Sequence, residues 1–261
     1  MQLGLNGKVA LVSAGSKGMG RSIALALAAE GMKVAISARG KAALDATAAE
    51  VAAKGPGALA IEADVSRAAD VDNMVARTVS HFGSLDVLVV NAGGPPARPF
   101  VDTSDSDWEE AVNLTLMSAV RSIREALPHL VASRGSVITI ESFSVKQPVN
   151  GLLLSNALRP GVVGMIKTLA DELGEKGVRF NNILPGMIMT DRSIHLAETR
   201  ARATGQSVDD VIAQTASTIP LRRYGQPEEI ANLAVFLASS AASYLTGTSI
   251  LCDGGLYRGL Y

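Results

Sequence analysis

The chain has 261 residues, 48% of them apolar, and its 24 basic and 25 acidic residues leave a formal net charge of −1. The length fits one large α/β domain or two small ones, and the apolar content is sufficient for a sizeable core. The balanced charge argues against nucleic acid or an anionic membrane surface as a partner, and no uncharged apolar run is long enough to span a membrane. The N-terminus has no signal-peptide pattern, and the one cysteine, Cys252, cannot form an intrachain disulfide, so we expect a reducing, cytoplasmic environment.

Short apolar segments rich in β-branched residues alternate with helix-like segments along the chain. The predicted strands cover residues 8–13, 33–38, 58–63, 86–91, 136–142, 178–184 and 248–253. The predicted helices cover residues 19–30, 41–54, 67–82, 106–132, 156–176 and 227–239. Uninterrupted apolar strands indicate burial on both faces, and strict alternation predicts a parallel sheet with right-handed crossovers. The sequence therefore predicts a doubly wound α/β fold of seven parallel strands, formed as a single domain over residues 1–261.

Two helix starts carry capping signals, and one segment breaks the alternation. Ser106 with Glu109 predicts a capping box for the fourth helix, and Pro227 suits the first turn of the last helix. Residues 187–225 are rich in charged and small residues and follow the carboxyl end of a predicted strand. We expect this segment to form a substrate lid.

The segment VSAGSKGMGRSIALALA follows the first predicted strand and opens the first predicted helix. Its glycines Gly15, Gly18 and Gly20 lack a Cβ atom, so the backbone can approach a pyrophosphate, and the helix N-terminus offers free N–H groups. A glycine-rich stretch can be only a tight turn, but its place after the first strand of an alternating chain favours nucleotide binding.

The end of the second predicted strand bears on which nucleotide binds. A carboxylate there would bind the ribose hydroxyls of NAD, whereas this chain reads AISARGK, with Arg39 and no acidic residue. Lys17 adds a second cation within the glycine loop. Both can pair with a 2′-phosphate, or they can be solvated surface cations, and the sequence favours NADP over NAD.

Five motifs resemble those of the short-chain dehydrogenase/reductase family, and the match covers nearly the whole chain. They are GSKGMG, in which Ala14 replaces the family's usual first glycine, ADV at 63–65, NAGG at 91–94, LPGMIMT at 184–190, and the segment 222–255. The resemblance implies a Rossmann-type fold with strand order 3-2-1-4-5-6-7, an NAD(P)-dependent oxidoreductase, and a homotetramer or homodimer. The cofactor-binding residues that it implies are Ser13, Gly15, Ser16, Lys17, Gly18, Met19, Gly20, Arg39, Asp64, Val65, Asn91, Ala92, Gly93, Arg159, Pro185, Gly186, Ile188 and Thr190.

The family's catalytic set is Asn, Ser, Tyr and Lys, and only the first two have counterparts here. The Asn falls on Asn113 of AVNLT, and the Ser falls on Ser142 of TIESFS. Counting back without a gap from the Pro-Gly pair at 185–186 places the Tyr at Ser155 and the Lys at Arg159. The 13-residue interval from Ser142 to Ser155 matches the family spacing, and no Tyr occurs between residues 1 and 223. The Tyr and Lys are therefore replaced, and the four candidate catalytic residues are Asn113, Ser142, Ser155 and Arg159.

These replacements weaken proton delivery more than they weaken charge stabilisation. In the family, the Tyr transfers a proton, and a phenol near pKa ~10 can be tuned by one cation. An aliphatic hydroxyl such as that of Ser155 is far less acidic. Arg159 can bind ribose hydroxyls or stabilise a developing oxyanion, but a guanidinium is a poor proton donor. Lys146 and Glu141 flank Ser142 as candidate substitutes, or they are a solvated lysine and a strand-end carboxylate.

Pro160 supports a second interpretation of Ser155. Proline inside a helix removes a hydrogen bond and disfavours the α region for the residue before it. We therefore expect the helix to begin no earlier than about Ser155, with irregular hydrogen bonding before Pro160. Ser155 or Asn156 would then be a helix cap without a chemical role.

Other polar residues give weaker indications. The three histidines have no metal-ligand spacing, so no metal is expected. Only His195 lies in the predicted lid, where Arg192, Arg200 and Arg202 can meet an acidic substrate or simply be solvated.

Three functions remain open from the sequence. The first is an NADP-dependent oxidoreductase acting on a small carbonyl or alcohol or a 3-oxoacyl-like substrate, with non-standard proton delivery. The second is a reductase of conjugated C=C or C=N bonds, which tolerates weak acid catalysis. The third is a non-catalytic nucleotide-binding protein. The sequence favours the first of these, with a small molecule as substrate and self-association as the expected partnership.

Overall fold

A seven-stranded parallel sheet forms the centre of the protein. The computed structural model describes residues 2–260, and its strands follow the order β3-β2-β1-β4-β5-β6-β7. The strands are β1 Val9–Val12, β2 Lys33–Ala38, β3 Gly57–Glu62, β4 Val87–Val90, β5 Ser136–Ile140, β6 Arg179–Pro185 and β7 Thr248–Cys252. All neighbouring pairs are parallel. The predicted fold class and strand order are confirmed.

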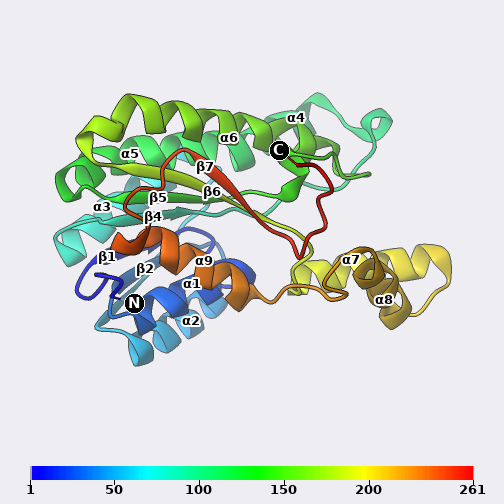
Figure 1. The fold of residues 1–261 in the computed structure, drawn as a ribbon, viewed down its shortest axis with the longest axis horizontal. Helices are drawn as coiled ribbons and strands as arrows, with labels where there is room; N and C mark the ends of the chain where they lie inside the picture. The colour runs from blue at the N-terminus through cyan, green and yellow to red at the C-terminus, as the bar shows by residue number, and fades with distance from the viewer. Residues whose placement is uncertain (1, 261) are drawn as a thin grey trace.

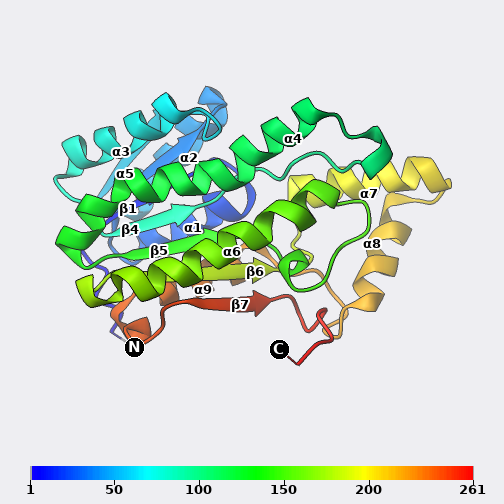
Figure 2. The same cartoon turned by 90° about the horizontal axis from the view of Figure 1, so that it is seen from above.

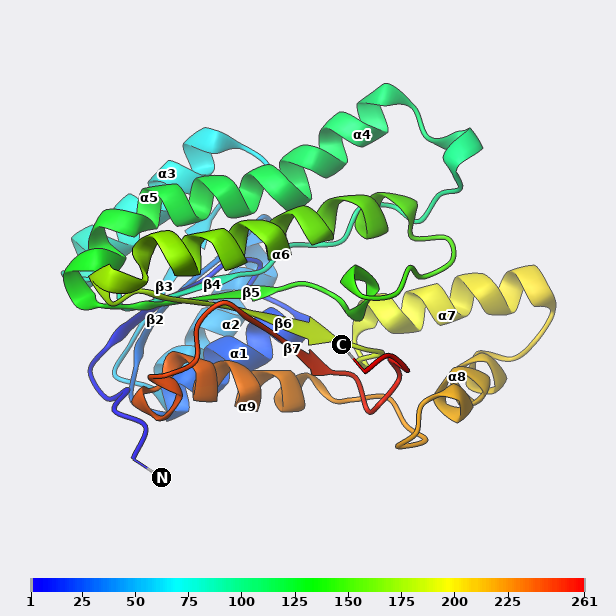
Figure 3. The ribbon, with the colours of Figure 1, turned by 45° about the horizontal axis from the view of Figure 1, so that its top comes forward.

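Helices cover both faces of this sheet, as the right-handed crossovers of a doubly wound fold require (Figure 1). One layer holds α1 Gly18–Ala29, α2 Lys41–Lys54 and α9 Pro227–Ala238, and the other holds α3 Ala68–Phe82, α5 Ser118–Ser133 and α6 Leu153–Leu173. Figure 3 shows the second layer, with α5 and α6 running side by side over the strands. None of the helices among residues 2–260 is long and apolar enough to cross a membrane.

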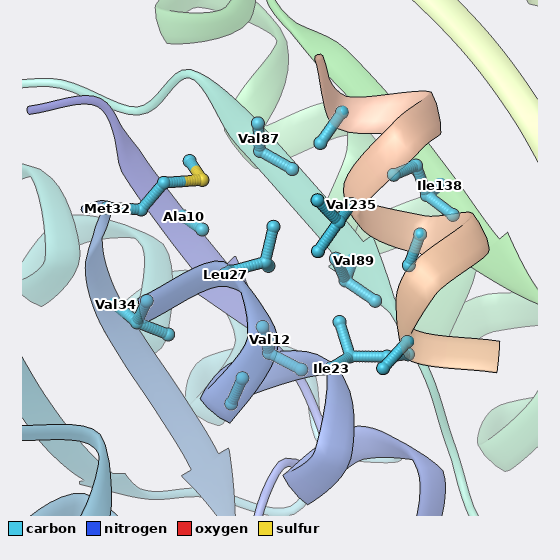
Figure 4. Packing of buried hydrophobic residues seen from close by; sticks show 14 of the residues in the cluster. Ala10, Val12, Ile23, Leu27, Met32, Val34, Val87, Val89, Ile138 and Val235 are labelled. Atoms are coloured by element: carbon cyan, nitrogen blue, oxygen red, sulfur yellow. The ribbon is translucent and has the colours of Figure 1, made fainter. Parts of the chain in front are cut away.

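Alternate residues of each strand enter different halves of the core. Ala10 and Val12 of β1 pack with α1 and α9, whereas Val9 and Leu11 pack with α3, α5 and α6. Figure 4 shows the first half, in which Leu27 of α1 lies among the strand residues. Fully burying a side chain of this size contributes roughly 1.5–3 kcal/mol. The apolar side chains of the central strands thus fill the core on both faces of the sheet. Polar groups that bind a ligand are therefore expected at the carboxyl ends of the strands.

The predicted helix over 106–132 is divided into three parts. These are α4 Asp105–Ala111, a π-helical turn over Val112–Met117, and α5. The capping box at its start is also two residues earlier than predicted. Ser104 accepts from the backbone N–H of Asp107 at 3.2 Å, and Asp107 accepts from the N–H of Ser104 at 2.9 Å. The sequence pattern S-D-S-D-W-E offers both boxes, and the extended backbone at Ser104 selects the first.

Helix α6 corrects the expectation drawn from Pro160. The helix begins at Leu153, before Ser155, and it includes Pro160. The N–H of Asn156 bonds to the carbonyl of Leu152 at 2.8 Å, so helical bonding is established upstream of the proline. A proline removes only its own N–H bond, and the packing of α6 on the sheet tolerates that loss, so the expectation of irregular bonding before Pro160 is wrong. The observed start lies two residues before the expected one at Ser155.

Residues 187–225 stand beyond the carboxyl ends of the strands (Figure 2). They contain two helices that the sequence did not indicate, α7 Asp191–Thr204 and α8 Val208–Thr218. Both have long exposed faces, and their few buried residues form a small separate cluster of Ala197, Ala201 and Val211. The sparse apolar residues explain why no helical period was recognised. The lid role of this segment stays a prediction.

We expect Ser104→Ala to lower the free energy of unfolding by about 1 kcal/mol, because it removes the N-cap acceptor of α4. Ser106→Ala is the matched control, since its hydroxyl contacts only the Ser104 hydroxyl at 2.9 Å. Urea unfolding of the two variants tests the assignment. A larger loss of unfolding free energy in Ser106→Ala than in Ser104→Ala would support the capping box of Ser106 and Glu109 that was predicted from the sequence.

Candidate active site

A cavity of about 810 Å³ lies at the carboxyl ends of the central strands. Its wall combines the glycine loop, the start of α2, the loops after β3 and β4, and the start of α7. The lining residues are Ala14, Ser16, Lys17, Gly18, Met19, Ala38, Arg39, Gly40, Lys41, Ala42, Ala43, Ala63, Asp64, Val65, Asn91, Ala92, Gly93, Leu114, Thr190, Asp191 and Arg192. Segments from six parts of the sequence meet here, Leu114 of the π-helical turn among them, because all parallel strands end at one edge.

The glycine loop forms one wall of the cavity, and two of its positions depend on the lack of a Cβ. Gly18 starts α1 with a φ of +52°, in the region that disfavours L side chains. A Cβ at Gly20 would lie 2.4 Å from the carbonyl oxygen of Ala14 and 2.8 Å from Nδ2 of Asn91. The loop therefore stays close to β4, which keeps the N-terminus of α1 open toward the cavity.

Eleven of the predicted cofactor residues line this cavity, and the other seven are not part of its lining. The lining members are Ser16, Lys17, Gly18, Met19, Arg39, Asp64, Val65, Asn91, Ala92, Gly93 and Thr190. Those outside the lining are Ser13, Gly15, Gly20, Arg159, Pro185, Gly186 and Ile188.

Most of these outer residues have a structural reason for their positions. The hydroxyl of Ser13 is buried, donates to the carbonyl of Asn91 at 2.7 Å and accepts from its N–H at 2.9 Å, so it ties β1 to β4. Gly186 lies against Asp253, where a Cβ would approach the Asp253 Cα to 2.6 Å. Ile188 is buried and bridges to Gly225.

Cations gather where β2 ends. The Arg39 side chain is 77% exposed and lies 3.8 Å from the carboxylate of Asp64. Lys17 and Lys41 line the same end of the cavity. Lys41 was not among the cofactor residues predicted from the sequence, although this lysine is two residues after Arg39 and is the first residue of α2.

Asp64 is held in its ionised form in this region. Burial acts to raise the pKa of its carboxyl, but hydrogen bonds from the Ser66 N–H and hydroxyl and the charges of Arg39 and Arg67 together lower the pKa below its usual value. The Ser66 bonds are 3.0 and 2.8 Å long. A fixed carboxylate with two neighbouring donors gives this end of the cavity a defined shape.

The candidate catalytic residues come from three elements that meet on α6. The π-helical turn with Asn113 and the 3-10 turn that follows Ser142 both pack on α6, which carries Ser155 and Arg159. Nδ2 of Asn113 donates to the carbonyl of Glu109 at 3.0 Å, and its Oδ1 accepts from Arg121 at 3.0 Å. The Ser142 hydroxyl accepts from the N–H of Ser144 at 3.1 Å.

Arg121 is a positioning residue that the sequence did not reveal. One Nη donates to Asn113, and the other donates to the carbonyl of Ser66 at 2.9 Å. The same guanidinium thus connects the π-helical turn with the loop that follows Asp64. A π-helical turn is frequently found at functional sites, and here Arg121 fixes its orientation.

Ser155 is not a helix cap. It lies inside α6, it is 7% exposed, and its Oγ accepts from Nε of Arg159 at 2.9 Å. Asn156 does not cap α6 either, because its amide holds the preceding turn through two bonds to the backbone of Val149. The cap interpretation is therefore wrong. Ser155 and Arg159 instead form a hydrogen-bonded pair one helical turn apart.

Arg159 also makes a buried ion pair that its sequence position did not indicate. Its Nη1 lies 3.0 Å from Oε2 of Glu141, and the two side chains are only 11% and 5% exposed. The same nitrogen donates to the carbonyl of Ile140 at 3.3 Å. Burial raises the pKa of Glu141 to about 7, although the charge and hydrogen bond of Arg159 act to lower it. Glu141 is thus neither solvated nor a simple strand-end group.

The remaining polar candidates lie farther from this cluster. Lys146 is exposed, with its ammonium 5.8 Å from the ring centre of Tyr257. His195 is exposed beside Glu198, and Arg200 and Arg202 point to solvent. Only Arg192 of the lid arginines lines the cavity. No group of three or more metal-ligand side chains occurs within residues 2–260.

We expect Glu141 to make the free energy of unfolding fall as the pH rises from about 4.5 to about 7. The folded-state pKa of about 7 lies above the ordinary 4.5, so in this range the folded chain binds more protons than the unfolded chain. Glu141→Gln should remove this contribution, on the order of 1–3 kcal/mol, when urea unfolding is compared across the range. Equal pH slopes in the two proteins would show that Glu141 ionises normally in the folded state.

Comparisons with known proteins agree with this architecture. A family described as enoyl-(acyl carrier protein) reductase matches residues 13–257. A 3-oxoacyl-(acyl-carrier-protein) reductase of Staphylococcus epidermidis is 36% identical over 252 residues, which cover 96% of this chain and 99% of that protein. A short chain dehydrogenase/reductase of Aspergillus oryzae is 34% identical over 256 residues, covering 97% and 95% of the two chains.

A solved structure gives the same result. The L-sorbose reductase of Gluconobacter frateurii, complexed with NADPH and L-sorbose, superposes with a TM-score of 0.96 at 32% identity and with full coverage of both chains. Together with the seven-stranded order and the glycine loop, these similarities show that the chain belongs to the short-chain dehydrogenase/reductase family.

Proposed function

We propose that the protein is an NADP-dependent oxidoreductase that acts on a small carbonyl or alcohol or a 3-oxoacyl-like substrate, with proton delivery that does not rely on a Tyr-Lys pair. The observation that carries the proposal is the cation cluster at the end of β2. Arg39, Lys17 and Lys41 all line the cavity, and neither β2 nor the two residues that follow it include an acidic side chain. Charge-assisted hydrogen bonds to a 2′-phosphate would favour NADP over NAD.

The cavity fits such a dinucleotide along its length. The glycine loop and the N-terminus of α1 would hold the pyrophosphate, Asp64 and Val65 would border the adenine, and Asn91 to Gly93 would border the ribose and nicotinamide. The nicotinamide would supply or accept a hydride. The relatives support this assignment, since the L-sorbose reductase binds NADPH and the bacterial relatives are 3-oxoacyl-(acyl-carrier-protein) reductases.

The candidate catalytic residues beside the expected nicotinamide position are better suited to orienting and polarising a substrate than to donating a proton to it. Asn113 is fixed by Arg121, and Ser155 by Arg159, so these side chains are held in defined positions. During reduction of a C=O bond, the hydride electron pair would enter the carbon, the π electrons would move to oxygen, and water would supply the proton. Hydrogen-bond donors placed beside that oxygen would stabilise its developing charge.

One observation favours a second candidate function. The Ser155 hydroxyl is buried and accepts a hydrogen bond from Arg159, and Arg159 also forms an ion pair with Glu141. A reductase of conjugated C=C or C=N bonds needs less acid catalysis at the reacting carbon, and would suit this arrangement. A panel of ketones, enones and imines with NADPH, followed at the nicotinamide absorbance, distinguishes the candidates. Tight NADPH binding without turnover of any compound would indicate a non-catalytic nucleotide-binding protein.

We also propose that the protein self-associates and that it is cytoplasmic. Large apolar side chains are strongly exposed at Phe100, Val101 and Tyr244, with 72%, 86% and 102% exposure. Exposed apolar groups of this size favour burial against another surface, and a homotetramer or homodimer would cover them. Light scattering of the purified protein measures the assembly.

We expect NADPH to bind more tightly than NADH, and Arg39→Asp to reduce that preference about tenfold or more. Loss of one charge-assisted contact is worth ~1.5–3 kcal/mol, and the new carboxylate would repel the phosphate. Calorimetric titration with both nucleotides measures the ratio. The matched control is Arg77→Asp, an exposed arginine on α3 that does not line the cavity. Equal affinities for the two nucleotides in the natural protein contradict the assignment.

We expect the family's Tyr-Lys pair to function here only if Glu141 is also removed. In Ser155→Tyr/Arg159→Lys, the new ammonium would pair with Glu141 instead of lowering the phenol pKa. The triple change with Glu141→Ser leaves that ammonium free, and a placed general acid contributes ~10²–10⁴-fold. Ketone reduction by the double and triple variants is compared with Glu141→Ser alone, and the tyrosinate absorbance reports the phenol pKa. Similar phenol pKa values in the double and triple variants would show that Glu141 does not neutralise position 159.

A further inference from the structure

Arg192 differs from the other cavity cations in its partners. It is the second residue of α7, and its Nη1 and Nη2 donate to the carbonyls of Gly94 and Pro95 at 2.9 and 3.2 Å. No carboxylate of the described residues 2–260 lies within ion-pair distance of it, whereas Arg39 lies near Asp64 and Arg159 pairs with Glu141. The carbonyls orient the guanidinium without neutralising it.

The surroundings of Arg192 disfavour a positive charge. Burial by the atoms of the cavity wall lowers its pKa, and the nearby charge of Arg159 lowers it further. Its place at the N-terminus of α7, the positive end of a helix dipole, adds to this cost. The side chain is nevertheless open to solvent and lines the cavity. A guanidinium in such a position can bind a ligand that carries a negative charge.

The donors of Arg192 are only partly used. A guanidinium has five N–H groups, and two of them are engaged by the carbonyls within the described chain. Gly94 makes this geometry possible, because a Cβ there would lie 2.7 Å from Nη2 and 2.9 Å from Cζ of Arg192. The loop after β4 and the lid helix α7 thus hold the guanidinium in place from two sides.

The two arginines of the reactive end therefore have different roles. Arg159 has a counter-charge within the protein, the Glu141 carboxylate at 3.0 Å. Arg192 has no such counter-charge among residues 2–260.

We propose that Arg192 is a further anion-binding residue of this cavity, besides the cations at the end of β2, and takes an anionic oxygen group, either a phosphate of the bound dinucleotide or a carboxylate of the substrate. The proposal rests on the proposed function only in naming these two sources. It also predicts that removing Arg159 affects anion binding less than removing Arg192, although Arg159 occupies the family's lysine position.

The test is a set of calorimetric titrations on the full chain. Arg192→Gln removes the charge, Gly94→Ala displaces the guanidinium while keeping it, and Arg200→Gln is the control on the exposed side of the same helix. Each variant is titrated with NADPH and with inorganic pyrophosphate. The complex with the oxidised nucleotide NADP⁺, which has no hydride to transfer, is then titrated with 3-oxobutanoate and with the neutral ketone butanone.

A dinucleotide phosphate as the anion predicts about tenfold weaker NADPH and pyrophosphate binding in Arg192→Gln, a smaller loss in Gly94→Ala, and none in Arg200→Gln. A substrate carboxylate predicts unchanged NADPH binding, with loss of 3-oxobutanoate but not butanone. Unchanged binding of all the anions in Arg192→Gln overturns the proposal. If that variant does not fold, the same comparison is made with Gly94→Ala. If the natural protein binds no NADPH, the proposed function fails, and the pyrophosphate titrations alone decide the role of Arg192.

Discussion

The parallel sheet is the constraint on which the rest of the structure depends. The central strands are buried on both faces, so the polar side chains that line the cavity lie where the strands end. All seven strands end at the same edge, so residues as distant in sequence as Lys17, Asp64 and Thr190 meet around one cavity. The position of the site thus follows from the burial of apolar side chains. Its chemistry depends on the residues that terminate each strand.

The end of β5 shows how one such residue changes the chemistry. Glu141 continues directly from the buried strand, and its carboxylate pairs with Arg159 in the covering helix. Two buried charges are costly to desolvate, and each becomes much more costly if its partner is lost. The pair therefore binds β5 to α6 at the point where Ser155 is held. It also means that a cation at position 159 does not by itself give the cavity a positive potential.

The sequence placed all seven strands within two residues of their observed bounds, because uninterrupted β-branched runs indicate little else, and its resemblance to the family implied the strand order. It predicted the end of β2 as a cation site for the same local reason, since Arg39 follows its strand directly. Prediction from the sequence was wrong where a local sequence rule and tertiary packing favour different structures. Pro160 indicated a late helix start, yet packing on the sheet holds α6 helical through it. Neither the π-helical turn around Asn113 nor the 18-residue separation between Glu141 and Arg159 leaves a recognisable local pattern.

The distribution of charge along the cavity follows from these same contacts. At the β2 end, the exposed cations Arg39 and Lys41 stand near carboxylates but keep most of their surface in water, so that screening leaves them free to bind a phosphate. Elsewhere in the site, Arg159 is ion-paired with Glu141, and Arg192 of α7 is oriented by the carbonyls of Gly94 and Pro95 in the loop after β4. Helix α7 carries a cation without a carboxylate partner among residues 2–260, so the position of this helix would depend on the charge of a ligand bound beside it. Binding of an anion would then strengthen the contact between α7 and the loop after β4, because the ligand relieves the repulsion between Arg192 and Arg159.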